Sequence, residues 1–269
     1  MIKWKQNKLI NILVIMDWIQ RIITKKNSLI LIIILFTIPI YSENEVCNSD
    51  TKIIFDLIKK SDLRSLKKNL TNKNLNCLNE EGESPLTYTL KLNSEEIYNH
   101  KNRFKILKLL LTHKANPNFK NSEGLAPIHH LIEYDDIISI LKLFLKYKTD
   151  IQIKNKENQN LLFDLIISDV RDYDFKQKVI NLFLKQKGDI NSQDNSGNTI
   201  LMHMLSHTKA SKHDFSEMIL YLYNKGINLN LKNKDNQTAL DISKKNSYAK
   251  KNQHLTLEKL MNRKLKNPL

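Results

Sequence analysis

Apolar and polar positions recur in blocks along most of this chain of 269 residues. Polar segments that open on Asn or Asp and lead into an apolar run begin at Asn79, Asn121, Asn155, Asp194 and Asn233. Each is followed by a second apolar block at helical spacing, and these blocks begin at Ile106, Ile140, Val179, Met218 and, more weakly, Leu255. Such a period is typical of repeat proteins, whose units stack on one another. It predicts units made of a turn, a helix, a second helix and another turn.

The turn before the first helix of each unit requires a residue that tolerates a positive φ. Gly82, Gly124 and Gly197 occupy this position in three units, and Asn158 and Asn236 occupy it in the other two. Glycine adopts the left-handed region without steric cost, and asparagine is the next most tolerant residue. The turn is therefore predicted to have the same backbone conformation in all five units.

Glycine and proline also mark the two ends of the helices. Gly188 and Gly226 follow second helices, where we expect a positive φ. Pro85 and Pro127 stand at the start of first helices, where the missing N–H costs nothing.

These units resemble the ankyrin repeat, through "SPLTYTL" and "APIHHLI" at the first helix and "KGDIN" at the exit. The third unit, "NLLFDLI", lacks the proline and the histidine. It is recognised as a repeat only by its position in the period, and not by its residue types. The resemblance implies an all-α ankyrin-repeat solenoid of helix-turn-helix units with short β-turn or hairpin connections. It predicts an N-terminal capping helix pair at 43–78 and five repeats, at 79–120, 121–154, 155–193, 194–232 and 233–269. Extra residues between the two helices are expected at 92–102, 168–174 and 206–214.

The histidines do not indicate a metal site. The resemblance implies that His129 hydrogen-bonds neighbouring turns, and His130 cannot point the same way from one helix. His203 and His207 are four residues apart, but the glutamate of the zinc motif H-E-x-x-H is missing between them. We found no nucleophile elbow, phosphate loop or cysteine cluster, so we expect no metal, no cofactor and no enzyme activity.

The resemblance implies noncatalytic binding of a protein, whose identity the sequence does not give, through the concave face formed by turn tips and first helices. The candidate residues are chosen by their position in the repeat: Asn121, Ser122, Glu123, Leu125, Lys156, Glu157, Gln159, Asn195, Ser196, Asn198, Lys234, Asp235 and Gln237.

The formal net charge of +15 raises nucleic acid or an anionic membrane as alternative partners. Only five of the 43 basic residues are arginine, the residue that reads phosphate and guanine in bidentate fashion. This composition disfavours nucleic acid.

The N-terminal segment 1–42 is predicted to be a signal peptide or an N-terminal membrane anchor, with Met16 as an alternative start. Lys25 and Lys26 precede the apolar stretch 28–42, and the polar "ENE" follows it. That order is typical of a secretory signal, and the apolar run is short for a membrane span. We expect cleavage after Ser42 and export to the periplasm or the medium. The alternative is a single-pass protein attached to the membrane through 28–42. In an exported chain, Cys47 and Cys77 are free to form a disulfide, although their spacing does not demand one.

Overall fold

The computed structural model describes residues 46–92, 100–133, 136–168, 172–206, 215–246 and 251–266. Asn44–Leu269 forms one compact unit, and Met1–Glu43 is a separate one. The predicted signal peptide or anchor at 1–42 lies outside the described residues. Parts of the predicted insertions lie outside them too, because 93–99, 169–171 and 207–214 are not described.

The described residues form helices in six successive pairs. The pairs are α3 (Ser49–Lys59) with α4 (Leu63–Asn69), α5 (Pro85–Lys91) with α6 (His100–Thr112), η1 (Pro127–Glu133) with α7 (Ile137–Lys146), α8 (Leu161–Ile167) with α9 (Tyr173–Lys185), α10 (Ile200–Ser206) with α11 (Ser216–Asn224), and α12 (Ala239–Lys245) with α13 (Lys251–Lys266). Within the described ranges extended backbone pairs only in isolated bridges, as between Gln193 and Thr199. The all-α solenoid predicted from the repeats is confirmed.

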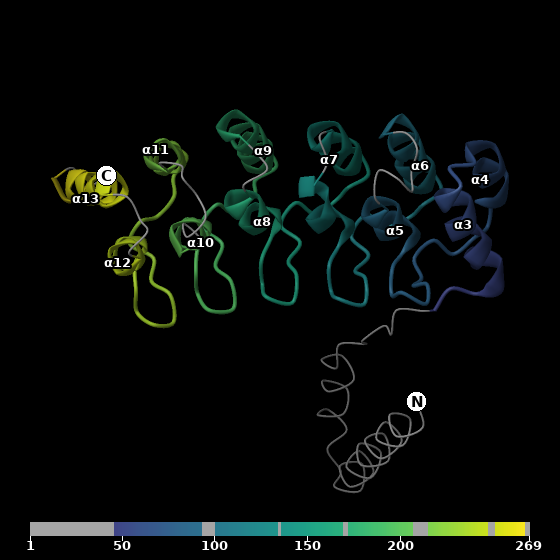
Figure 1. Cartoon of the computed structure of the whole chain (residues 1–269), viewed down its shortest axis with the longest axis horizontal. Helices are drawn as coiled ribbons and strands as arrows, with labels where there is room; N and C mark the ends of the chain where they lie inside the picture. The colour runs from purple at the N-terminus through teal and green to yellow at the C-terminus, as the bar shows by residue number, and fades with distance from the viewer. Residues whose placement is uncertain are drawn as a thin grey trace, which may run out of the picture. The chain divides into compact units, whose positions relative to one another are not determined.

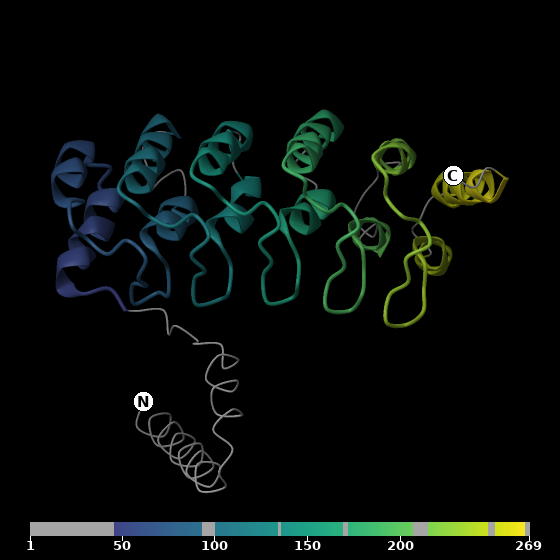
Figure 2. The same cartoon turned by 180° about the vertical axis from the view of Figure 1, so that it is seen from behind.

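The helices lie in two rows. The first helices of the pairs (α3, α5, η1, α8, α10 and α12) contact one another in that order along the unit. The second helices (α4, α6, α7, α9, α11 and α13) form the other row, and long loops extend from the opposite side, next to the first helices (Figures 1 and 2). The core between the rows is continuous and includes the fully buried rings of Phe144, Phe163 and Phe183.

Local sequence sets the start of the first helices. Ser84 caps α5 in a capping box with Thr87, and Pro85 takes the first helical position, as expected. Pro127 also begins a helix, but η1 is a 3-10 helix, in which the N–H of His129 donates to the carbonyl of Ala126 at 3.0 Å. The prediction of a helix start at Pro127 is therefore confirmed, although the helix is a tighter one.

The predicted left-handed turns are all present. Gly82, Gly124 and Gly197 have φ values of +78°, +83° and +78°. Asn158 and Asn236 have φ values of 63° and 59°. One backbone conformation thus recurs in all five loops.

The expectation for Gly188 was wrong. Gly226 has φ +90°, but at the corresponding exit the positive φ falls on Lys187, at 62°, and not on Gly188. Gly188 is the next residue, and a Cβ there would lie 2.2 Å from Cε1 of Phe183. Glycine is needed at 188 because the ring of Phe183 leaves no space for a side chain.

Across the described segments, no helix combines the length and the apolar character needed to cross a bilayer.

Candidate functional site

The candidate surface is the row of loops that precede the first helices. In the first loop, the side-chain oxygen of Asn79 accepts hydrogen bonds from the N–H groups of Glu81 and Glu83, at 3.1 and 2.8 Å. The N–H of Asn79 also donates to the carbonyl of Glu83 at 2.9 Å. The same arrangement recurs at Asn121, Asn155, Asp194 and Asn233. Each loop tip is therefore closed by its own opening side chain, as in an Asx turn.

Neighbouring tips are also joined to each other. The N–H of Ser122 donates to the carbonyl of Gly82 at 2.9 Å, across two successive loops. Equivalent backbone bonds of 2.9 Å join Asn195 to Glu157 and Lys234 to Ser196. The third loop is joined to the second by a side chain instead, because Nζ of Lys156 donates to the carbonyl of Ser122 at 3.0 Å. The five tips thus form one hydrogen-bonded row.

The structure places the candidate binding residues at three depths. Eight are exposed at the tips: Ser122, Glu123, Lys156, Glu157, Asn195, Ser196, Lys234 and Asp235. Four are partly buried at the base of the tips: Leu125, Gln159, Asn198 and Gln237. Asn121 is only 2% exposed, so it is not available to a partner and its place in the candidate set is corrected.

Asn121 instead belongs to a buried polar cluster around Glu83. The Glu83 side chain is 3% exposed and accepts a hydrogen bond from Nζ of Lys91 at 2.8 Å. The amide of Asn121 lies 3.2 Å from both carboxylate oxygens. The hydrogen bond with Glu83 raises the pKa of Lys91. The buried carboxylate of Glu83 thus connects the first loop to the second through its hydrogen bonds with Asn121.

A second row of side chains joins the exits of successive units, and the sequence analysis missed it. Asn76, Asn118, Gln152 and Asn191 each accept a hydrogen bond from a backbone N–H of the next exit, at 2.7, 2.8, 3.0 and 2.7 Å. We call these four residues the exit ladder. Each exit also carries Asn or Asp two residues before the ladder position, as in "NLN", "NPN", "DIQ" and "DIN". That recurring pair was the signal in the sequence.

The histidines are held in the array. His129 is 8% exposed, and its Nδ1 accepts the N–H of Ala126 at 3.1 Å. Burial lowers the pKa of His129, and backbone groups of Ala126, Gln159 and Ile153 offset part of that effect. The hydrogen bonds of His129 are both with Ala126, at the start of its own helix, and among the described residues its Nε2 has no partner. The expected hydrogen bond from His129 to a neighbouring turn is therefore not present.

His203 pairs with the loop residue Asp194, with Nε2 and Oδ2 2.7 Å apart. Burial opposes the charge on Asp194, but the bond to His203 and backbone N–H groups bring the net pKa of the carboxyl below its usual value. His207 lies outside the described residues. Within the described residues, no cluster of three or more His, Cys, Asp or Glu side chains could hold a metal ion.

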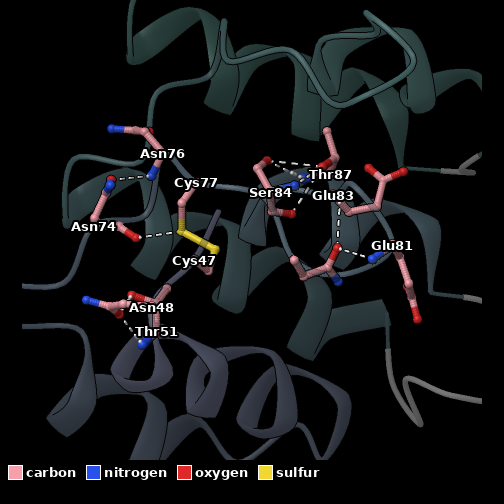
Figure 3. Close-up of a disulfide and its surroundings, with 11 residues drawn as sticks. Cys47, Asn48, Thr51, Asn74, Asn76, Cys77, Glu81, Glu83, Ser84 and Thr87 are labelled. Carbon is pink, nitrogen blue, oxygen red and sulfur yellow. Dashed lines mark hydrogen bonds between the residues drawn. A yellow bond between two sulfur atoms is a disulfide. The ribbon is translucent and has the colours of Figure 1, made fainter. Parts of the chain in front are cut away.

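The two cysteines form a disulfide, which the sequence had left open. Cys47 and Cys77 are buried, and their Cα atoms lie 4.9 Å apart (Figure 3). The N–H of Cys47 donates to the carbonyl of Leu78 at 2.9 Å. The bridge ties the residues that precede α3 to the start of the first loop.

Comparisons with known proteins agree with this architecture. No family model matches the chain. A putative ankyrin repeat protein of fowlpox virus is 40% identical over 52 residues, which are 19% of this chain and 15% of the viral protein. The match therefore spans a small part of that relative's length.

Solved structures match over most of the chain. The ankyrin repeat protein EF0377 covers 78% of this chain and 96% of its own, with 20% identity and a TM-score of 0.59. An ankyrin repeat domain from Acinetobacter baumannii covers 78% and 97%, with 17% identity and a TM-score of 0.60. A chain in the complex of the predatory endopeptidase Bd0816 of Bdellovibrio bacteriovorus with immunity protein Bd3460 covers 77% and 97%, with 23% identity and a TM-score of 0.56. With the five repeated loops and the six helix pairs, these likenesses show that the chain has the ankyrin-repeat fold.

Proposed function

We propose that this chain is an exported, noncatalytic scaffold that binds a protein through its loop tips. The observation that carries the proposal is the hydrogen-bonded row of tips, which exposes Ser122, Glu123, Lys156, Glu157, Asn195, Ser196, Lys234 and Asp235 on one side of the array. Because the backbone of the tips is already held by hydrogen bonds, it loses little conformational entropy when a partner binds.

The comparisons support a protein as the partner. Scaffolds of ankyrin fold generally mediate contacts between proteins, and one structural neighbour belongs to a complex of an endopeptidase with an immunity protein. The exposed tips carry both signs of charge, with Glu123, Glu157 and Asp235 beside Lys156 and Lys234. A surface of mixed charge suits a protein partner better than it suits a polyanion.

Two features support export. The segment 1–42 has the charge and hydropathy order of a secretory signal. The Cys47–Cys77 disulfide fits a chain that folds in an oxidising compartment, because such bonds are rare in the cytosol. The alternative is a scaffold tethered to the membrane because residues 28–42 are retained. N-terminal sequencing and the intact mass of the exported chain separate the two, since cleavage after Ser42 is expected for the first and an uncleaved segment for the second.

Matched variants test the binding face. The tip variant replaces Glu123, Glu157 and Lys234 with alanine, and the control replaces Lys105, Lys142 and Lys178 on second helices. All six side chains are exposed, so each substitution is expected to cost less than about 0.5 kcal/mol of stability. Detergent-solubilised envelope from the native cell is passed over each immobilised protein, and captured proteins are quantified by mass spectrometry. We expect a partner captured by wild type and by the control to be lost from the tip variant. If the tip variant still captures the partner and the control does not, the proposal that the loop tips bind the partner is wrong.

A further inference from the structure

The excess positive charge of the array is concentrated on one side. Each second helix from α6 onward packs one face on the core and leaves an exposed stripe at helical spacing. The exposed residues of α6 and α7 are Lys105, Lys108, Thr112, Ser139, Lys142 and Lys146. Those described on α9, α11 and α13 are Asp174, Lys178, Asn181, Lys185, Glu217, Leu220, Asn224, Leu255, Lys259 and Asn262. We call this set, with Arg64, Lys67 and Lys68 of α4, the second-helix surface.

Basic residues dominate this surface from α4 to α9. Among its members, only Asp174 and Glu217 carry negative charge. The loop side differs, because acidic residues such as Glu80, Glu81 and Glu157 are exposed there along with lysines. The second helices lie in one row in both views of the array (Figures 1 and 2). We call the exposed basic residues of α4, α6, α7 and α9 along this row the basic band. Like charges gathered in this way repel one another, and an anionic partner relieves that repulsion.

Two exposed leucines extend the band at its C-terminal end. Leu220 is 41% exposed and Leu255 is 40% exposed, and their helices, α11 and α13, contact each other. Of the large apolar side chains in the described ranges, only Val46 and Ile53 are similarly exposed, and both lie near the N-terminal end of the array. On α13, Leu255 lies one helical turn from the exposed Lys259. A cation next to an exposed apolar side chain is a combination by which proteins lie on membrane surfaces, with cations at the headgroups and apolar side chains below them.

We propose that the second-helix surface docks on a membrane surface rich in anionic phospholipid, so that the loop tips are left free for a protein partner. The chemistry favours lipid over nucleic acid. The band uses lysine as a point charge, whereas recognition of nucleic acid relies on arginine forks and on aromatic side chains that stack on bases. Arg64 is the arginine of the band, and none of its members is aromatic.

Lysine footprinting on the full chain tests the proposal. The protein is treated with an amine-acetylating reagent alone, with phosphatidylcholine vesicles, or with vesicles that also contain phosphatidylglycerol, and acetylation is measured peptide by peptide. We expect Lys105, Lys108, Lys142 and Lys146 to be protected only by the anionic vesicles, and to regain reactivity at about 0.5 M salt. Lys234 on the loop side should stay reactive throughout. Because each lysine is followed separately, membrane binding by residues 1–42 does not imitate the result.

Variants give a second measurement. Replacing Lys105, Lys142 and Lys178 with glutamine should weaken binding to anionic vesicles at least about tenfold, whereas Lys232, Lys234 and Lys245, replaced together, serve as the charge-matched control. Replacing Leu220 and Leu255 with serine should also weaken vesicle binding.

Three footprinting results would overturn the proposal: equal protection of loop-side lysines, equal protection by neutral vesicles, or no protection of the second-helix lysines. Protection by duplex DNA at lower phosphate concentration than by vesicles assigns the band to nucleic acid instead. Capture of a protein by the loop tips is measured separately and does not depend on any of these outcomes.

Discussion

The side-chain oxygen of Asn76 accepts a hydrogen bond of 2.7 Å from the backbone N–H of Asn116, 40 residues further along the chain. The same relationship connects Asn118 to Asp150 and Asn191 to Asn228. Neighbouring units are therefore joined at their exits by polar side chains as well as by their apolar core. A solenoid unit contacts only its neighbours, so each such bond adds to one interface between units.

We expect the replacement of Asn118 by alanine to destabilise the array by about 1 to 3 kcal/mol. The substitution removes the bond accepted from Asp150 and the bond donated to the carbonyl of Lys148, at 2.8 and 3.2 Å, and a typical hydrogen bond contributes about 0.5 to 1.5 kcal/mol. The measurement is the free energy of urea unfolding. Asn181→Ala, at an exposed position on α9, is the control and should change stability little. Equal losses at the two positions would mean that the exit ladder contributes nothing.

Sequence reasoning succeeded where one residue's own conformation decides the structure. The left-handed turns at Gly82 and Asn158 could be predicted because the repeat aligns them and few residues tolerate that backbone region. It failed at Gly188, because the contact with Phe183 depends on how the exit folds back over the second helix.

The burial of two basic side chains could not be predicted from the sequence either. Arg103 is 3% exposed and donates to the carbonyl of Leu92 at the end of α5, and Lys176 is 7% exposed and donates to the carbonyl of Ile166 near the end of α8. A charged residue on a helix is expected at the surface unless it has a partner. These partners are carbonyl groups at the ends of other helices, where a cation is favourable. Their positions follow from packing between helices and not from the residues themselves. The same limit applies to the candidate binding residues, because the burial of Asn121 could not be predicted from its position in the repeat.

Glycine occurs at the exits for two reasons, a positive φ at Gly226 and a lack of space for a side chain at Gly188, and substitution by asparagine distinguishes them. Gly226 has φ +90° and open space where a Cβ would lie, so Gly226→Asn is expected to cost less than about 1 kcal/mol. Gly188→Asn should cost about 1 to 3 kcal/mol or more, because its Cβ would overlap the buried ring of Phe183. Thermal unfolding of both variants gives the comparison. A larger loss at Gly226 would show that backbone conformation, and not space, is the stronger constraint.

The disulfide is expected to stabilise the N-terminal helix pair. Cys47 and Cys77 are separated by 30 residues, and a bridge that closes such a loop contributes about 2 to 4 kcal/mol. Cys47→Ala combined with Cys77→Ala should lower the melting temperature. A reductant present during unfolding should lower the melting temperature of the wild type and leave that of the double variant unchanged. A wild type that is insensitive to reductant under these conditions would contradict the stabilising role.

Asp164 is expected to make stability depend on pH. Burial raises the pKa of its carboxyl from 3.8 to about 6, with Glu157 acting in the same direction and His203 against it. Between these two pKa values the folded state holds a proton that the unfolded state has released. The contribution of Asp164 to stability therefore rises as pH falls through about 6, and above that pH its buried charge is unfavourable.

Asp164→Asn removes this unfavourable charge and should stabilise the protein by about 1 to 3 kcal/mol at about pH 7.5. The gain should shrink as pH falls below about 6 and be largely gone at about pH 4, where wild-type Asp164 is protonated in the folded state. Urea unfolding of the wild type and the variant across this range measures the difference at each pH. Asp235→Asn, at an exposed loop tip, is the control and should change stability by less than about 0.5 kcal/mol throughout. A gain that is the same at both ends of the range would mean that the new amide acts through packing, and not by relieving a buried charge.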